Sequence, residues 1–173
     1  MNTANNGFAA ADDNDVNIQG FPNAGNQYVT FTLDREEYGL DILQVQEIIG
    51  YRKMTRIPNV SDAVSGILNL RGAIVPVIDL RKKFGLPSIS CTESTVIVIV
   101  VVHDRTMGII VDAVSDVVSF LDSEIRQPPQ ATAGIRTEFF SGMGQKDDKL
   151  AILMNLGRLL SCEEMGGVDN VVH

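Results

Sequence analysis

Residues 66–81 read Gly-Ile-Leu-Asn-Leu-Arg-Gly-Ala-Ile-Val-Pro-Val-Ile-Asp-Leu-Arg and decide more of the fold than any other stretch. Two apolar, strand-like runs, 67–70 and 73–78, meet at Arg71-Gly72. Glycine reaches backbone angles that a side chain forbids, so Gly72 predicts a sharp bend or bulge between two strands. The bend would place the guanidinium of Arg71 beside apolar surface. Such an arginine either anchors a protein partner through its planar fork or is a structural residue tied into the turn.

Strand-like patterns continue on both sides of this stretch. Residues 28–33 alternate in polarity and lead into a polar turn at 34–37, as in a hairpin. Residues 96–102 are seven β-branched residues in a row, which indicates a buried strand. Repeated strands with short turns predict an all-β fold with short helices.

The chain also contains a weak internal repeat. Residues 45–49, Val-Gln-Glu-Ile-Ile, recur as 114–118, Val-Ser-Asp-Val-Val. The second copy is richer in β-branched residues, so we expect both 40–49 and 109–118 to be mainly strand. A repeated set of strands predicts two small antiparallel barrels.

A second pair of matching segments extends the repeat. Ser65-Gly66 precedes Asp79-Leu80 at the same spacing at which Ser141-Gly142 precedes Asn155-Leu156. The Asp and the Asn can cap short helices, which we expect at 80–84, ended by a glycine, and at 156–164.

Composition limits the possible functions. The chain has 173 residues and is 45% hydrophobic, which allows one ordinary domain or two small barrels with a shared core. The net charge is −8, with no Lys or Arg before Arg35, which argues against direct binding to nucleic acid or to anionic lipid. We expect residues 1–26, rich in Asn, Asp, Gly and Ala, to form a disordered tail.

The sequence also predicts a cytoplasmic protein with no direct membrane insertion. The longest apolar run, 96–102, is far short of the roughly 20 residues of a membrane helix. There is no basic start followed by an apolar stretch, so we expect no secretory signal. Cys91 and Cys162 are then most simply free thiols.

The sequence lacks the combinations of residues that catalysis or metal binding would need. His103 and His173 are the only histidines, which leaves serine or cysteine nucleophiles without a positioned base. Two histidines and two scattered cysteines make no metal set. We therefore predict no enzyme, no catalytic residue, no cofactor and no metal.

The long pattern from Asn69-Leu-Arg-Gly to Asp79-Leu-Arg resembles the signature of the CheW-like domain family of bacterial chemotaxis coupling proteins. The resemblance covers residues 27–165, leaving 166–173 as a C-terminal tail. It implies two five-stranded, SH3-like barrels packed back to back, with a nominal boundary near residue 90 and strands that can be exchanged between the halves. Further segments that carry the resemblance are 36–39, 41–48, 108–117, 124–126 and 162–165.

The resemblance also implies partners. Members of this family bind the cytoplasmic hairpin tip of methyl-accepting chemoreceptors in a groove between the barrels, at positions that match Val45, Glu47, Arg71 and Val117. From spacing alone, Val45 and Glu47 share one strand face, although a buried Val45 beside a solvated Glu47 is the plainer interpretation.

The second implied partner is the regulatory domain of the histidine kinase CheA, with which these proteins build rings. The kinase contacts match Gly66 and Arg126. Many relatives carry an aromatic residue five positions after that arginine, where this chain has Ala131. Gly66 can also be required by the backbone alone.

The sequence therefore predicts a non-enzymatic adaptor that couples chemoreceptors to CheA and is recruited to membrane-associated receptor arrays. The alternative is a small-ligand-binding β-barrel, in which the groove would be a pocket. A nucleic-acid-binding barrel is disfavoured by the net charge and by the absence of Trp.

Overall fold

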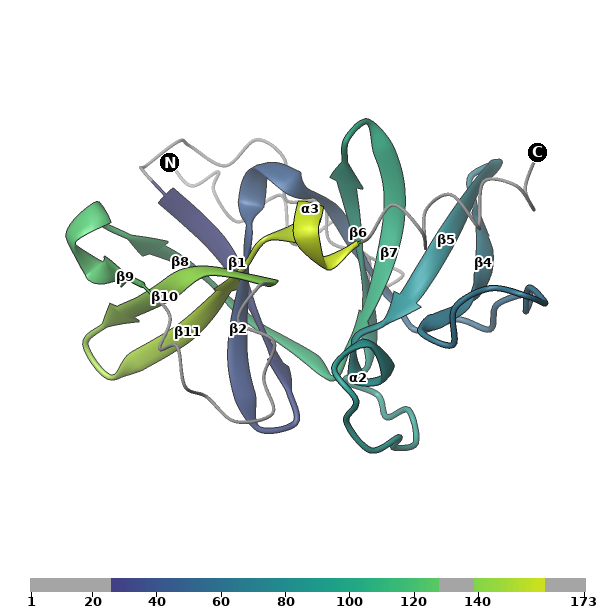
Figure 1. Ribbon diagram of the computed structural model, residues 1–173, viewed down its shortest axis with the longest axis horizontal. Helices are drawn as coiled ribbons and strands as arrows, with labels where there is room; N and C mark the ends of the chain where they lie inside the picture. Colours follow the sequence, from purple (N-terminus) through teal and green to yellow (C-terminus); the bar gives the residue numbers. More distant parts are fainter. Residues whose placement is uncertain (1–25, 128–138, 161–173) are drawn as a thin grey trace, which may run out of the picture.

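The computed structural model describes residues 26–127 and 139–160, and within them the chain is mainly β-strand, with mostly antiparallel pairing (Figure 1). Short helical turns connect them: η2 (Ile42–Gln44), α2 (Leu80–Lys83), η3 (Asp122–Glu124) and α3 (Leu156–Leu159). The strands are β1 (Asn26–Leu33), β2 (Glu36–Asp41), β3 (Val45–Gly50), β4 (Val64–Leu70), β5 (Ala73–Asp79), β6 (Val96–Val102), β7 (Arg105–Val111), β8 (Ala113–Phe120), β9 (Ile125–Arg126), β10 (Phe140–Lys146) and β11 (Lys149–Met154).

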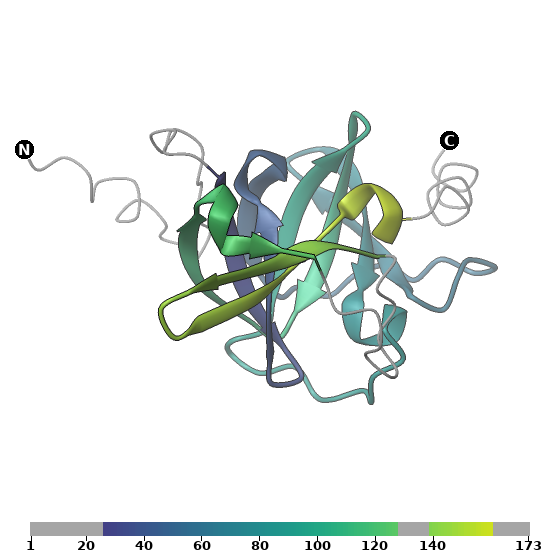
Figure 2. The same ribbon diagram turned by 60° about the vertical axis from the view of Figure 1, so that its left-hand side comes forward.

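The strands form two sheets that pack side by side, as Figures 1 and 2 show from two directions. The strand order is β8-β1-β2-β11-β10-β9 in the six-stranded sheet and β3-β6-β7-β5-β4 in the five-stranded sheet. Each sheet contains one parallel pair, β2 with β11 and β5 with β7. The all-β prediction of two packed barrels is confirmed, although the first sheet has six strands, because the two-residue β9 adds an edge.

Sheet membership does not follow chain order. The N-terminal hairpin of β1 and β2 pairs with β8 and β11, so the six-stranded sheet combines the first strands with the last. The five-stranded sheet is formed by the segment between them, β3–β7.

Three apolar clusters fill the part of the molecule that the structure describes. The largest lies between the sheets and takes side chains from both, because β1 and β2 contribute Phe31 and Leu40 while β5 and β7 contribute Ile78 and Ile109, all four fully buried. The other face of the five-stranded sheet encloses a second cluster: Ile49, Leu68, Leu70, Val75, Val77, Ile97 and Ile99. The six-stranded sheet encloses the third: Val118, Phe120, Ala151 and Leu153. The shared central cluster makes the two barrels one packing unit.

Tight two-residue turns join consecutive strands. Arg71 and Gly72 connect β4 to β5 with φ of 51° and 89°. Both angles are in the left-handed region that a type I′ hairpin requires, so the bend expected at Gly72 is confirmed. The turns at Asp34-Arg35 and His103-Asp104 also have positive φ at both positions.

The weak sequence repeat corresponds to repeated structure. The paired segments 45–49 and 114–118 each contain a register shift, which places an extra residue at Gln46 and at Ser115. The β4–β5 and β10–β11 hairpins contain equivalent shifts at Ser65 and Ser141. A bulge therefore recurs at each pair of matching positions.

The short helices follow the same repeat. Asp79 accepts a hydrogen bond from the backbone N–H of Arg81 at 2.9 Å, and Asn155 accepts one from Arg158 at 3.1 Å. Both therefore cap helices as expected. The second helix ends at Leu159 rather than 164, because the backbone of Leu160 is already extended.

The terminal segments are only partly covered. β1 begins at Asn26, one residue inside the predicted tail 1–26, and the rest of that tail lies outside the described residues. The predicted C-terminal tail 166–173 and Cys162 also lie outside them.

Candidate functional site

The β4–β5 hairpin reaches across the five-stranded sheet to its opposite edge. β3 and β4 are the two edge strands, and an ion pair between Arg71 NH2 and Glu47 Oε2 joins the hairpin to β3. The backbone N–H of Gly72 donates to Asn69 Oδ1 at 2.9 Å, which fixes the turn that carries Arg71. The ion pair therefore links the β4–β5 hairpin to β3, and β3 and β4 are not joined by backbone hydrogen bonds in the five-stranded sheet.

The two partners of this ion pair differ in exposure. The side chain of Glu47 is 9% exposed, whereas that of Arg71 is 62% exposed. The interpretation of Glu47 as a solvated acid is therefore wrong, because the carboxylate sits inside the sheet edge. Arg71 is tied to Glu47, as the structural interpretation expects, and its side chain is still largely exposed, so the role of partner anchor stays a prediction.

The bulge at Gln46 separates two residues that we expected on one face. Val45 packs into the central cluster with Ile48, whereas Ile49 packs into the cluster inside the five-stranded sheet. Strand alternation then places Glu47 with Ile49, on the face opposite Val45. The expectation of a shared face is therefore wrong.

Val45 and Val117 both belong to the packing of the central cluster. Val45 is buried there, and Val117 is half-buried and packs against the same cluster from β8. Of the four predicted receptor-binding residues, the structure thus brings Arg71 and Glu47 together at the sheet edge and places Val45 and Val117 in the packing between the barrels.

Two exposed apolar side chains near this edge were not identified from the sequence. Leu43 in η2 is 89% exposed and directly precedes the β3 edge, and Ile74 on β5, beside the Arg71-Gly72 turn, is 48% exposed. Strand alternation could have found Ile74, since Val75 and Val77 face inward. Leu43 had no such signal, because the three-residue η2 interrupts the alternation.

Gly66 has a strong structural requirement. A Cβ built on it would lie 2.4 Å from the carbonyl oxygen of Thr55, and its φ is +155°. Thr55 is held there by reciprocal backbone hydrogen bonds with Ile67 at 2.8 and 2.9 Å. The backbone alone therefore explains a glycine at this position, as one of the two interpretations anticipated.

Arg126 lies far from Gly66. It is exposed on β9, at the outer edge of the six-stranded sheet, whereas Gly66 is on β4, at the outer edge of the five-stranded sheet (Figure 1). The two predicted kinase-binding residues therefore belong to opposite ends of the molecule. Ala131 lies outside the described residues.

Arg81 is a residue whose role sequence reasoning did not assign. It is 8% exposed, and its Nε and NH2 donate to the two oxygens of Asp112 at 2.9 and 2.8 Å. Its NH1 donates to the carbonyl of Pro87 at 2.7 Å, and NH2 is 3.4 Å from Asp34 in the β1–β2 turn. The hydrogen bonds from Arg81 hold the pKa of Asp112 below its usual range. Arg81 therefore ties the five-stranded sheet to the six-stranded one.

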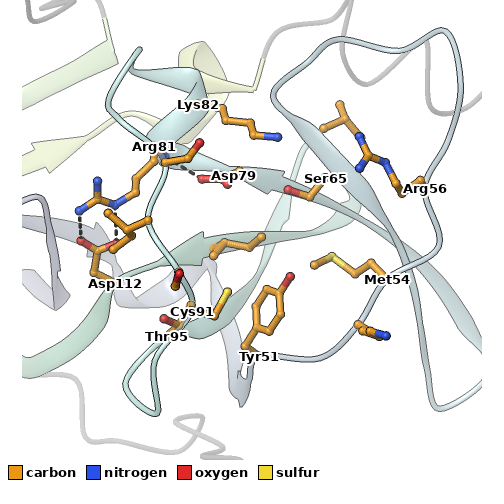
Figure 3. A pocket seen from close by; sticks show the side chains of 16 residues that line it. Tyr51, Met54, Arg56, Ser65, Asp79, Arg81, Lys82, Cys91, Thr95 and Asp112 are labelled. Atoms are coloured by element: carbon orange, nitrogen blue, oxygen red, sulfur yellow. Dashed lines mark hydrogen bonds and ion pairs between the residues drawn. The ribbon is translucent and has the colours of Figure 1, made fainter.

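The alternative of a small-ligand barrel has one concrete location. A cavity of about 560 Å³ opens on the five-stranded half, between the segment after β3 and the loop before β6 (Figure 3). Its lining includes Arg56, Ser65 and Lys82, but none of the four predicted receptor-binding residues. The cavity and the Arg71 edge are therefore separate features.

Within residues 26–127 and 139–160, no helix is long and apolar enough to cross a membrane. In the same ranges, no three His, Cys, Asp or Glu side chains gather closely enough to hold a metal ion.

Comparison with known proteins identifies a matching family. The family model described as the CheW-like domain matches residues 27–164. A chemotaxis protein CheW of Klebsiella aerogenes is 47% identical over 147 residues, which cover 85% of this chain and 89% of the relative. The CheW of Treponema pallidum is 33% identical over 149 residues, covering 84% and 88%. The crystal structure of the scaffolding protein TtCheW from Thermoanaerobacter tengcongensis superposes with a TM-score of 0.75 at 38% identity, covering 82% of this chain and 96% of that one.

Proposed function

Since the chain belongs to the CheW-like domain family, we propose that it is a chemotaxis scaffold that couples chemoreceptors to the histidine kinase CheA. The family is one of non-catalytic scaffolding proteins, and the chain is accordingly not an enzyme. It acts in the cytoplasm, recruited to receptor arrays at the membrane.

The observation that carries the receptor-binding part is the exposed guanidinium of Arg71. One of its N–H groups is used by Glu47, which orients the planar fork and leaves further donors facing solvent. A fork held in place loses less conformational entropy on binding than a free one. The tip of the receptor hairpin supplies carbonyl and carboxylate oxygens to these donors, and its apolar side chains pack on Leu43 and Ile74.

Val45 and Val117 have a supporting role in this proposal. Both belong to the packing between the barrels, so they set the shape of the groove that receives the receptor helix. Truncating buried Val45 would cost stability as well as affinity, which makes it a poor test of binding.

The kinase contacts lie at the two ends of the molecule. The β4 end, near Gly66, and the β9 end, with Arg126, each bind a regulatory domain of CheA, so one adaptor joins two neighbours in a ring. The placement of these strands at opposite outer edges supports such a double contact. Receptor state reaches the kinase only if the adaptor's contacts differ between the on and off states.

The decisive experiment titrates a receptor cytoplasmic hairpin fragment against charge-matched variants. Arg71→Ala alone leaves the buried carboxylate of Glu47 unpaired, so the informative variant is the double change Arg71→Ala/Glu47→Gln. We expect it to weaken binding about thirty-fold, roughly 2 kcal/mol. The Arg71→Lys variant should recover only part of this loss, since an ammonium lacks the planar fork.

The matched control is Lys146→Ala/Asp148→Asn, which removes one exposed cation and one exposed acid from the β10–β11 turn of the other barrel. It should bind the fragment like the unmodified protein. Equal affinity of both double variants, with unchanged denaturation midpoints, would remove Arg71 from the receptor site.

A further inference from the structure

The cavity on the five-stranded half is built from three parts of the fold. The parallel pairing of Asp79 with Ile110 places β5 and β7 at its base. One wall is the segment after β3, which the Thr55–Ile67 bridge holds beside β4, and another is the loop before β6, which includes Ser88. None of these parts carries the Arg71–Glu47 pair.

The cavity is basic, although the chain as a whole carries a net charge of −8. Lys53, Arg56 and Lys82 line it, and none of the three forms an ion pair among the described residues. Arg81 and Asp112 also line it but neutralise each other. Only the carboxylate of Asp79 then opposes three cations, so the cavity has an excess of positive charge.

Two of these cations face the same part of the cavity. Figure 3 shows Lys82, from α2, and Arg56, from the segment after β3, with their charged ends turned toward each other and Ser65 between them, whereas Arg81 turns away to Asp112. Ser65 is the extra residue of the β4 bulge, a feature that re-aims a side chain. Two like charges turned together repel, and the single carboxylate of Asp79 does not balance the three cations of the lining, so an anion placed between Lys82 and Arg56 is stabilised.

The rest of the lining indicates what the anion is attached to. Tyr51 is 40% exposed and Ile89 is 53% exposed, and both line the cavity together with Met54. In Figure 3 the Tyr51 ring and Met54 lie on the side away from Lys82. The cavity thus has a cationic part and an apolar part, and its volume of about 560 Å³ suits one small molecule.

We propose that this cavity binds a small organic phosphate, with the phosphoryl group between Arg56, Lys82 and Ser65 and an apolar group against Tyr51 and Met54. A phosphoryl dianion matches two facing cations better than a singly charged carboxylate does. A bidentate guanidinium, an ammonium and a hydroxyl together supply its oxygens with donors. The site lies apart from the Arg71–Glu47 pair but borders the β4 end at Gly66, since Ser65 and Met54 line it, and it would give the scaffold a response to a dissolved ligand.

The test is calorimetric titration of the full chain at low ionic strength with three probes: phenyl phosphate, inorganic phosphate and benzoate. We expect saturable binding of phenyl phosphate, at least about tenfold tighter than benzoate because of the second charge and about tenfold tighter than inorganic phosphate because of the ring. Tyr51→Ala should reduce the affinity for phenyl phosphate to that for inorganic phosphate.

Two charge-matched double variants locate the site. Arg56→Gln/Lys82→Gln should weaken phenyl phosphate binding at least about thirty-fold, since two charge-assisted contacts are lost. Arg35→Gln/Lys146→Gln removes the same charges from the six-stranded half and should bind like the unmodified protein. Absence of saturable phenyl phosphate binding, equal affinity for benzoate, or equal weakening in the two double variants would each overturn the proposal. Receptor-fragment affinity should stay unchanged in Arg56→Gln/Lys82→Gln, which separates this test from that of the scaffold function.

Discussion

The two barrels place an acid after the same bulge and pair it with a cation from a hairpin, but in very different surroundings. In the five-stranded half Glu47 follows the bulge at Gln46 and pairs with Arg71, and the acid is buried. In the six-stranded half Asp116 follows the bulge at Ser115 and pairs with Lys149 at 3.0 Å, with both side chains more than half exposed.

The difference lies in what each pair does when it is broken. An exposed pair exchanges protein contacts for water at little cost, typically below about 1 kcal/mol. A buried carboxylate cannot be solvated when its partner is removed, so its charge is left uncompensated. The same bulge therefore leads to two ion pairs of different importance. The exposed Asp116–Lys149 pair can be lost at little cost, whereas the closure of the five-stranded barrel depends on the Glu47–Arg71 pair. The proposed receptor contact is made by Arg71 of this second pair.

Charge reversal at Glu47 and at Asp116 should give the largest difference in stability between the two halves. Glu47→Lys places a second cation in a buried site facing Arg71, and we expect the free energy of unfolding to fall by about 3–5 kcal/mol. Asp116→Lys, on the exposed side, should cost less than about 1 kcal/mol. Urea denaturation of both variants measures the difference, and similar losses would contradict the contrast in burial.

Gly66 and Gly142, which follow equivalent bulges in the two halves, allow the same comparison for the backbone. Gly66→Ala forces a Cβ against the Thr55 carbonyl oxygen at 2.4 Å, whereas the Cβ of Gly142→Ala would meet the Arg126 carbonyl oxygen at 3.0 Å. We expect losses of about 2–3 kcal/mol for the first and about 1 kcal/mol for the second. Denaturation midpoints measured under one condition provide the test. A loss at Gly142 as large as that at Gly66 would mean that the two bulges tolerate bulk equally.

Acid titration tests the link between the halves, with the smallest effect. Hydrogen bonds from Arg81 lower the pKa of Asp112, so its folded pKa lies below the unfolded value. Its contribution to stability is therefore present above the unfolded pKa of about 4 and is lost as pH falls through the folded pKa. We expect this loss to be smaller than the effects of the two preceding changes, because solvent screens the partly exposed pair.

The variants Asp112→Asn and Asp116→Asn distinguish how much each carboxylate contributes to the loss of stability in acid. Hydrogen bonds from Lys149 and from the Val117 N–H also lower the pKa of Asp116, but this group is more exposed. Asp112→Asn should flatten the loss of stability below about pH 4 more than Asp116→Asn does. The measurement is thermal unfolding followed from neutral to acid pH, and the reverse order would show that Asp112 does not link the barrels.

Much of the local structure was determined by the sequence itself. Gly72 predicted the β4–β5 turn because few other residues adopt its φ, and the unbroken β-branched run at 96–102 predicted a buried strand. Asp79 and Asn155 predicted two helix caps, because a short side-chain acceptor in that place satisfies free backbone N–H groups. The proposed roles of the site residues came from the family resemblance, because no local pattern distinguishes a binding residue from a structural one.

Only the tertiary structure decided which strands pair and which side chains are buried. Periodicity places alternate residues on the same face of a strand. One extra residue at Gln46 reverses that alternation, so Val45 and Glu47 lie on opposite faces of the sheet. Nothing local in the sequence places β2 beside β11, or Arg81 against Asp112, because those contacts join segments far apart in the chain. Burial of Glu47 depends on the hairpin that carries Arg71 reaching the opposite sheet edge, and such closure is a property of the whole barrel rather than of any segment.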